Sequence, residues 1–314
     1  MESVVGILDT QFSFGACRAL SAYAMAMAMM TLVRSLSFLL ISPLLLLTSC
    51  SQQEYGKVSY SAAPKVINVS EYDPKEKQRR GSSYTPLNQA ALKKNGSLGL
   101  VARCGKGAHI DTKCADFLVG AERQGMLLGT YYYLLPESNP TALADQYIAR
   151  LREIKRSRGL KTKKVLLAAD IHTKCKAWQI VAYLKRIKQL TGVTPVVYLE
   201  NSDTIRRTLN AASSSQKQFL KQHPYWLALY SNGYAGLETP QKLANATGVW
   251  DTWAMWQYGG VWWKNGRSNP HHYRGGSWKT PKYFGNLSQP TERNGFNGSR
   301  SALYRFWDKH SWAW

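Results

Sequence analysis

The sequence predicts an α/β fold, a modified TIM-like barrel of five strand–helix units and three further strands. Short apolar strands alternate with amphipathic helices from residue 98 to residue 258, and this alternation is typical of parallel strands with helices outside them. The repeating part lies within residues 81–314, a length that suits a closed barrel. A doubly wound open sheet is the alternative, but no glycine-rich phosphate loop follows the first expected strand.

The expected elements follow each other in a regular order. Strands are expected at residues 98–103, 126–133, 165–170, 194–199, 226–230 and 253–258. Helices are expected at residues 115–124, 143–154, 180–187 and 203–220, because apolar residues recur there at helical spacing. Gly125, Gly159 and Gly192 end three of these helices. Residues 261–290 predict a long loop or short antiparallel hairpins, and residues 302–307 predict a short closing helix or strand.

The N-terminal 49 residues read as a signal region. The apolar run Leu36–Leu47 is too short for a comfortable membrane span and has the length of a signal-peptide core. The tetrapeptide Leu47-Thr48-Ser49-Cys50 that follows resembles the lipobox of bacterial lipoproteins, in which the cysteine is lipidated. We therefore expect a protein anchored through Cys50 at the cell envelope, on the outer membrane or an extracytoplasmic membrane face. An uncleaved anchor helix is the alternative.

Three regions follow from this interpretation. A normal signal peptide would start at Met29 or Met30, so residues 1–29 read as an extension of the gene model. Residues 50–80 are polar and irregular and predict a flexible tether. Residues 81–314 form the expected barrel domain.

The formal charge of +22 belongs entirely to the chain after residue 49, because the first 49 residues are neutral overall. Such an excess attracts polyanions. The lysines and arginines are scattered along the sequence, and neither zinc-finger spacing nor an RNA-binding aromatic motif is present. We therefore expect peptidoglycan or another anionic glycan and a membrane as partners, no nucleic acid, and a monomer.

The cysteines predict little chemistry. Outside the signal region they are Cys104, Cys114 and Cys175, of which Cys104 and Cys114 are the nearest pair for a disulfide. His109 and His172 could be combined with them into a metal site, but the spacings match no known cluster. We expect no metal and no cofactor.

The ends of the expected strands supply the candidate site, because catalytic groups lie at the carboxyl ends of barrel strands. Asp170 and His172 directly follow a buried strand, and Glu200 follows the next strand along the chain. Rings and amides near such ends suit sugars, since ring faces pack on sugar rings and polar groups bind hydroxyls. The candidate substrate-binding residues are Tyr131, Tyr198, Trp226, Tyr230, Trp256, Gln257 and Tyr258. Some of the tryptophans near these strands are expected to be core residues instead.

Six segments in order resemble the family 25 glycoside hydrolases, which are lysozymes of the N-acetylmuramidase type. They are residues 99–107, 121–131, 195–198, 226–230, 253–258 and 292–298, and the fifth resembles the family's Trp-x-x-Trp-Gln-Tyr signature. The resemblance implies a modified barrel and cleavage of peptidoglycan. It also implies that the family's Asp-x-Glu, whose Glu is the general acid, stands here as Asp170-x-His172.

The resemblance also implies other departures. The family's opening Asp-Val-Ser is expected at residues 81–85, with Ser83 in place of the acid, Glu292 replaces a late Asp, and Lys106 replaces an acid. Three functions follow as hypotheses. The first is a cell-wall hydrolase in which Asp170 is joined by His172, Glu200 or Glu292. The second is a degenerate, lipid-anchored module that binds glycan, and the third is activity on another anionic glycan.

Overall fold

The computed structural model describes residues 62–74, 86–200, 202–229, 239–264, 267–272, 280–281, 283–285 and 291–314. Cys50, Ser83 and Tyr230 lie outside these ranges, so the predictions made for them stay predictions. Among the described residues, no helix is both long and apolar enough to cross a membrane.

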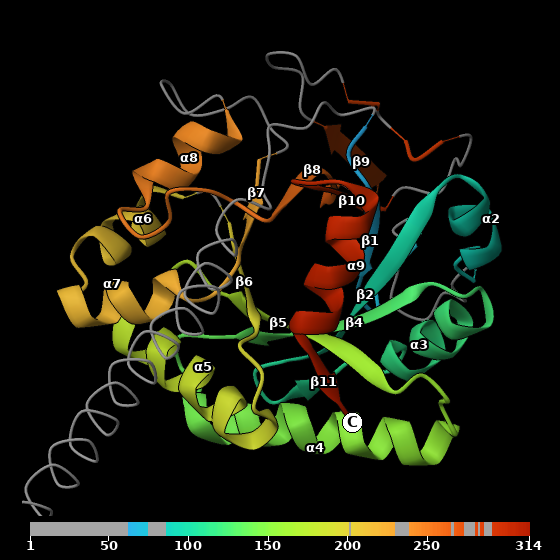
Figure 1. Ribbon diagram of the computed structural model, residues 1–314, viewed down its shortest axis with the longest axis horizontal. Helices are drawn as coiled ribbons and strands as arrows, with labels where there is room; N and C mark the ends of the chain where they lie inside the picture. The colour runs from blue at the N-terminus through green and yellow to red at the C-terminus, as the bar shows by residue number, and fades with distance from the viewer. Residues whose placement is uncertain are drawn as a thin grey trace, which may run out of the picture. The chain divides into compact units, whose positions relative to one another are not determined.

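Eight strands form a closed barrel (Figure 1). In spatial order they are β1 (Lys65–Val69), β10 (Glu292–Phe296), β8 (Met255–Lys264), β7 (Tyr225–Ala228), β6 (Val196–Leu199), β5 (Lys164–Ile171), β4 (Leu127–Leu134) and β2 (Ser97–Lys106), and β2 pairs with β1 to close the ring. All neighbours are parallel except β10, which is antiparallel to both β1 and β8. The predicted α/β barrel is confirmed.

Three short strands extend this barrel. β3 (His109–Ile110) pairs with the end of β2, β9 (Arg267–His272) forms a hairpin with β8, and β11 (Ser311–Ala313) pairs with the start of β5. The hairpin of β8 and β9 lies in the region where short antiparallel hairpins were one of two expectations.

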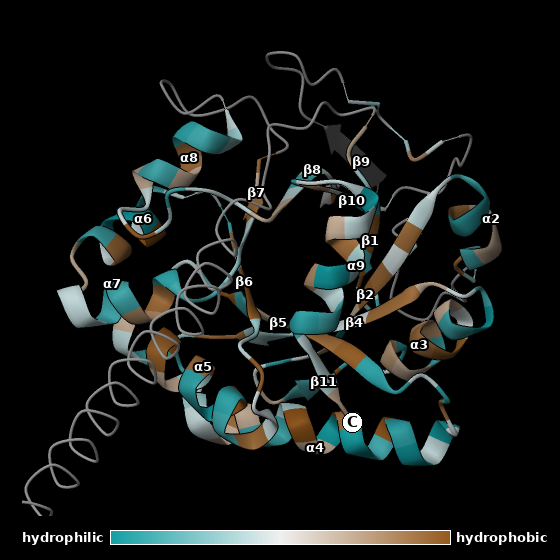
Figure 2. Ribbon diagram, in the orientation of Figure 1, coloured by the Kyte–Doolittle hydropathy of each residue, from teal (hydrophilic) through white to brown (hydrophobic). Residues whose placement is uncertain are grey.

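Helices surround the barrel, with their apolar sides on the strands and their polar sides outward (Figure 2). They are α2 (Gln89–Lys94), α3 (Cys114–Arg123), α4 (Pro140–Arg158), α5 (Ala177–Thr191), α6 (Asp203–Asn210), α7 (Ser214–Lys221), α8 (Pro240–Ala246) and α9 (Arg300–Lys309). α4 shows how local sequence fixes an element. Its N-cap Asn139 accepts hydrogen bonds from Thr141 N and Ala142 N, and Gly159 ends it with a left-handed backbone at φ 59°.

The amino-terminal end of the barrel is closed by α9, which lies in front of the strands in Figure 1. Trp307 of α9 donates a hydrogen bond from Nε1 to the carbonyl of Leu128 at 2.7 Å. A Cβ on Gly99 or Gly129 would come within 3.1 or 3.0 Å of the Trp307 ring. These two glycines therefore make room for an indole that packs against the start of the barrel. The carboxyl-terminal end is left for the site.

One expectation needs correction. The stretch 65–69, expected to belong to a flexible tether, is the buried barrel strand β1. Its run of valine and isoleucine is short and stands between polar residues, so alternation over a long window did not reveal it. The sequence also gave no expectation of α2, α8 or β11. Cys104 and Cys114 form the disulfide that was one of the expectations, and Cys175 is a buried free thiol.

Candidate active site

Polar side chains from four strands meet at the carboxyl-terminal end of the barrel. Asp170 lies near the end of β5 and is half-buried, and Asn68 lies near the end of β1. Glu292 is the first residue of β10, and the antiparallel direction of β10 places it directly opposite Asn68. Glu200 directly follows β6. Barrel enzymes use this end for catalysis, so these residues are the candidate site.

Asp170 is the acid most affected by its surroundings. Burial raises the pKa of its carboxyl well above the ordinary value, and the negative charges of Glu200 and Glu292 raise it further, while Arg103 and Lys106 oppose the rise. Glu200 and Glu292 are therefore near enough for their charges to act on the Asp170 carboxyl. A carboxyl group with a raised pKa keeps its proton toward neutral pH and can act as a general acid.

Glu200 stands at the rim of the site. Its residue is exposed overall, yet partial burial of its carboxyl raises the pKa, the charge of Glu292 adds to the rise, and His172 counteracts it. A glutamate that directly follows a strand can be either a solvated loop acid or a member of the site. The interactions with Asp170, His172 and Glu292 favour the second.

The His172 ring has a fixed orientation. Its Nδ1 accepts a hydrogen bond at 3.1 Å from the backbone N–H of Lys174, and its ring centroid lies 5.8 Å from that of Tyr133 at a tilt of 37°. Because Nδ1 is occupied as an acceptor, the proton of the neutral imidazole is on Nε2. The Nε2 atom is therefore the part of His172 available to a substrate.

Glu292 is held by a buried amide network. One of its carboxylate oxygens accepts hydrogen bonds from Asn68 Nδ2 and, at 3.4 Å, from Gln257 Nε2. The Asn68 amide oxygen in turn accepts from Gln257 Nε2 at 3.1 Å and from Asn294 Nδ2 at 2.8 Å. Tyr198 donates from its hydroxyl to Gln257 Oε1 at 2.8 Å. Glu292 is therefore held in place by two side-chain amide donors.

Asn68 was missed at the level of sequence. The opening Asp-Val-Ser motif was expected at residues 81–85, and Ser83 lies outside the described residues. The first barrel strand instead runs into Asn68-Val69-Ser70, which differs from the expected motif only at its first residue. The sequence did contain a signal for this strand. Asn68-Val69-Ser70 precedes the expected strand at residues 98–103, which is the position of the first strand of such a barrel.

Several of the predicted sugar-binding residues are too buried to contact a sugar. Trp226, Trp256 and Tyr258 are at most 1% exposed, so their rings contact protein and offer no face to a sugar. Gln257 is equally buried and acts through the network around Glu292. Tyr131 is buried beside the acids, since the charges of Glu292 and Asp170 add to the effect of burial and raise the pKa of its hydroxyl. These buried aromatics are packing residues because the barrel interior needs large side chains to fill it.

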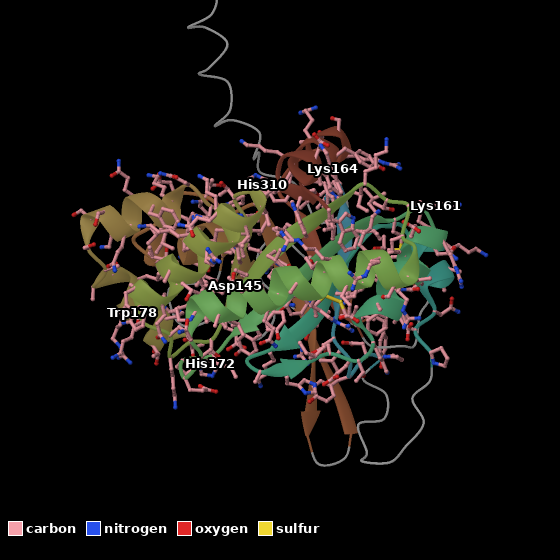
Figure 3. All side chains as sticks on the ribbon, turned by 90° about the horizontal axis from the view of Figure 1, so that it is seen from below. Asp145, Lys161, Lys164, His172, Trp178 and His310 are labelled. Carbon is pink, nitrogen blue, oxygen red and sulfur yellow. A yellow bond between two sulfur atoms is a disulfide. The ribbon has the colours of Figure 1, made fainter. Side chains whose placement is uncertain are left out.

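Trp178 is an exposed aromatic that the sequence did not single out. It lies in the first turn of α5, six residues after His172, and is 54% exposed. Figure 3 shows it on the same half of the molecule as His172, toward the opposite side from Lys164. Its exposed neighbours Lys174 and Lys176 add positive charge. A large exposed ring at a site rim is suited to stack on sugar.

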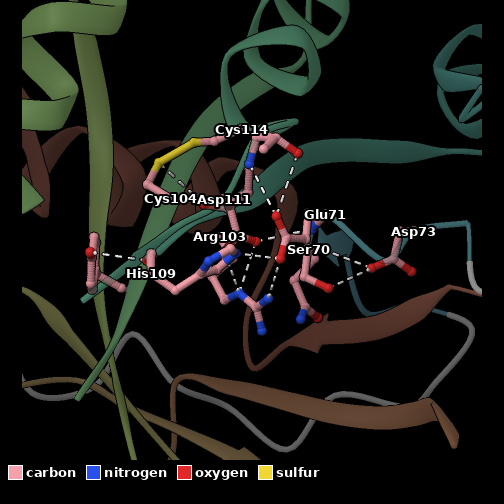
Figure 4. Close-up of polar contacts among 12 residues, drawn as sticks. Ser70, Glu71, Asp73, Arg103, Cys104, His109, Asp111 and Cys114 are labelled. Carbon is pink, nitrogen blue, oxygen red and sulfur yellow. Dashed lines mark hydrogen bonds and ion pairs between the residues drawn. A yellow bond between two sulfur atoms is a disulfide. The ribbon is translucent and has the colours of Figure 1, made fainter. Parts of the chain in front are cut away.

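A second polar cluster lies beside the disulfide (Figure 4). The Arg103 guanidinium donates from Nε to both carboxylate oxygens of buried Asp111 at 3.0 and 2.9 Å, and His109 Nε2 lies 2.6 Å from Glu71 Oε1. The side-chain ligand atoms of Glu71, His109 and Asp111 come within 4.8 Å of one another, a spacing that could hold a metal ion. Arg103 already supplies a positive charge to both carboxylates. The cluster is therefore an ion-pair network.

Comparison with known proteins identifies the family. The family model for glycosyl hydrolases family 25 matches residues 69–266. The chain belongs to glycosyl hydrolases family 25. No curated protein sequence matches it significantly.

Solved structures agree in fold with this family 25 chain. The structure of a family GH25 lysozyme from Aspergillus fumigatus has 18% sequence identity and a TM-score of 0.51, with 77% of this chain and 98% of that chain covered. The spore cortex lytic enzyme SleM from Clostridium perfringens has 19% identity and a TM-score of 0.53, with 76% and 69% covered. At this identity the likeness establishes the barrel, and the function must be argued from the site.

Proposed function

We propose that this family 25 protein is a peptidoglycan glycoside hydrolase of the lysozyme type. The observation that carries the proposal is the meeting of Asp170, Glu200 and Glu292, from three different strands, at the carboxyl-terminal end of the barrel. Glycoside cleavage needs one carboxyl group that gives a proton and one that stays negative. The raised pKa of Asp170 and the donors around Glu292 separate the two roles.

The cleavage step follows from these roles. The Asp170 carboxyl gives its proton to the glycosidic oxygen as the bond to the anomeric carbon breaks. The carboxylate of Glu292, with Glu200 at the rim, stabilises the positive charge that develops on the sugar. Water then bonds to the anomeric carbon through its oxygen, and a proton from that water restores the acid. No cofactor takes part in these steps.

The alternative is a member of the family that binds glycan and cleaves it slowly. Two residues favour this alternative, because Asn68 and His172 stand where the family resemblance implies carboxylates. An imidazolium near a developing sugar cation is repulsive, and loss of a general acid typically costs about 10²–10⁴-fold in rate. This alternative therefore predicts slow cleavage, because Asp170 is retained while the carboxylates expected at Asn68 and His172 are absent.

One assay separates the two functions. Purified peptidoglycan is incubated with the wild-type chain and with Asp170→Asn, new reducing ends are measured, and the bound fraction is determined by pelleting. Release by the wild type that is lost in the variant, with pelleting unchanged, supports the hydrolase. Strong pelleting with no release by either chain would establish the binding module instead.

We also propose that the chain is attached to the cell envelope through a lipid on Cys50. The support is the short apolar run followed by Leu47-Thr48-Ser49-Cys50 in the sequence. Labelled palmitate should enter the expressed protein and should fail to enter a Cys50→Ala variant. Equal labelling of both would refute attachment at this cysteine.

A further inference from the structure

We propose that the amino-terminal end of the barrel is a docking face for an anionic membrane, and that it holds the active site away from the bilayer. The face is formed by residues 152–164, at the end of α4 and in the loop to β5, and by residues 300–314, which include α9 and β11. These two segments carry ten lysine and arginine side chains against two carboxylates, Glu153 and Asp308. We call this surface the basic face.

The two segments form one continuous surface. β11 pairs with the start of β5, and Lys164 makes an ion pair of 2.5 Å with Asp308 of α9. Trp314 donates from Nε1 to the Thr162 carbonyl at 3.0 Å, and Arg152 lies 5.5 Å from the ring centroid of Trp312. The fold thus gathers cations that are scattered in the sequence. A patch of this kind produces a local positive potential that attracts an anionic surface.

Much of this charge is available to a partner. Six exposed cations of the basic face make no ion pair with an acidic side chain in the part of the chain that the structure describes: Arg152, Arg156, Lys161, Lys163, Arg300 and Lys309. Each cation near the surface of an anionic bilayer adds a favourable contribution to binding.

Aromatic residues among these cations favour a membrane over a nucleic acid. Tyr304 of α9 is 41% exposed, and Trp312 and Trp314 are half-buried on β11 and after it. Tyrosine and tryptophan are enriched at the membrane–water interface, where one part of the ring system is apolar and another is polar. Arginine and lysine beside such rings are typical of surfaces that lie on anionic lipid.

The direction of the chain leads to the same end of the barrel. β1 runs parallel to β2, and its first residue, Lys65, pairs with Ser97 at the start of β2. The first described residues, which precede β1, therefore lie at the amino-terminal end of the barrel, the end that carries the basic face. One acyl chain gives only marginal membrane binding, and a basic patch is the usual second signal. The anchor and the basic face would act together.

The active site lies at the other end. Lys164 begins β5, whereas Asp170 lies near its end and His172 just beyond it. Figure 3 shows Lys164 and His172 on opposite sides of the molecule. Eight residues of extended strand separate these ends by about 25 Å. Docking through the basic face would direct the carboxyl-terminal end of the barrel away from the membrane, toward a polymer outside it.

The chain provides a matched pair of variants for the test. Lys161-Thr-Lys163 and Lys174-Cys-Lys176 are both exposed lysine pairs with one residue between them, and they lie at opposite ends of β5. The full chain carrying Cys50→Ala, which removes the lipidation site, serves as the parent. It is pelleted with vesicles of phosphatidylcholine alone and with vesicles that contain one third phosphatidylglycerol, at low salt and at 0.5 M salt.

The parent should bind the anionic vesicles at low salt. It should bind the neutral vesicles much less, and it should bind the anionic vesicles much less at high salt. Lys161→Glu/Lys163→Glu should weaken binding at least tenfold, whereas Lys174→Glu/Lys176→Glu should change it less than threefold. Equal loss in both variants, or equal binding to neutral vesicles, would overturn the proposal. So would salt-sensitive binding to duplex DNA or to peptidoglycan with no vesicle binding. Circular dichroism checks that both variants are folded, and the result does not depend on catalysis.

Discussion

Asn68 donates a hydrogen bond from its side-chain amide to a carboxylate oxygen of Glu292, across the pair of strands β1 and β10. The amide is therefore a neutral neighbour of this carboxylate. The same Asn68 accepts hydrogen bonds from Gln257 and Asn294. One residue thus joins the catalytic end of the barrel to its buried polar interior.

Asn68→Asp should destabilise the protein in a pH-dependent manner. The new carboxylate would face Glu292, and like charges at this distance raise the pKa of one of them. Groups whose pKa is raised by folding reduce stability when they are ionised, so the loss should be present at pH 8 and shrink as the pH falls toward 4. We expect a loss of roughly 1–3 kcal/mol at pH 8, measured by urea unfolding. Asn68→Ala controls for loss of the amide, and an equal loss at both pH values would contradict the charge explanation.

The pH dependence of hydrolysis should report the acid role of Asp170. Only the protonated carboxyl can donate, so the rate should fall as the pH rises through its raised pKa. Arg103 opposes that rise, so Arg103→Gln should move the falling limb of the profile to higher pH. Reducing ends released from peptidoglycan between pH 4 and 9 give the profile. Asp111→Asn, which disturbs the same ion pair but keeps the arginine, is the control, and a limb that does not move would remove Arg103 from this role.

The sequence predicted the barrel well because its strands and helices are periodic and its helices end at glycines such as Gly159 and Gly192. It predicted Asp170 and Glu200 as candidate site residues because strand ends converge in any barrel, whereas Glu292 was predicted only from the family resemblance. It failed where function depends on contacts between distant strands. Asn68 and Gln257 meet Glu292 only after the barrel closes, and no local pattern encodes that meeting.

The aromatic residues show a different limit. A tryptophan in a strand is equally compatible with a sugar platform and with a core, and only burial decides between them. Trp226 and Trp256 are core residues, whereas the exposed Trp178 lies in a helix and belongs to no motif. The basic face could not be predicted from the sequence either, because it is assembled from segments about 140 residues apart.

His172→Glu should increase hydrolysis. A glutamate there would stand close to Asp170 and Glu200, whose charges would raise its pKa and favour proton donation. We expect a rise of about a hundredfold in the rate of reducing-end release, the lower end of the range for a general acid. His172→Gln has a similar size and no acid, and it should not raise the rate. Equal rates for both variants would show that this position does not limit catalysis.

Two buried histidines should make the protein sensitive to acid. His223 and His310 donate from Nδ1 to the carbonyls of Pro195 and Thr194, at 3.0 and 2.9 Å, just before β6. Burial lowers the pKa of each imidazole to about 4, and these hydrogen bonds only partly oppose the change.

Because both histidines have a lower pKa in the folded state, the unfolded chain binds more protons between pH 6.5 and 4. Stability should be complete above pH 6.5 and fall as the pH decreases to 4, by roughly 3 kcal/mol for each histidine. Urea unfolding at pH 7, 5.5 and 4.5 measures the slope. In His310→Asn the amide can donate in place of Nδ1, and the slope should become shallower. An unchanged slope would mean that other groups cause the acid sensitivity.

Trp178→Ala should weaken glycan binding without destabilising the fold. The indole is 54% exposed, so its removal deletes little buried surface, whereas a sugar ring stacked on it would lose most of its apolar contact. We expect about a tenfold weaker association with soluble peptidoglycan fragments in calorimetry and a change in unfolding free energy below about 0.5 kcal/mol. Tyr304→Ala removes a comparably exposed aromatic residue from the opposite end of the barrel and should leave glycan binding intact. If both variants bind as the wild type does, the glycan does not cross the rim at α5.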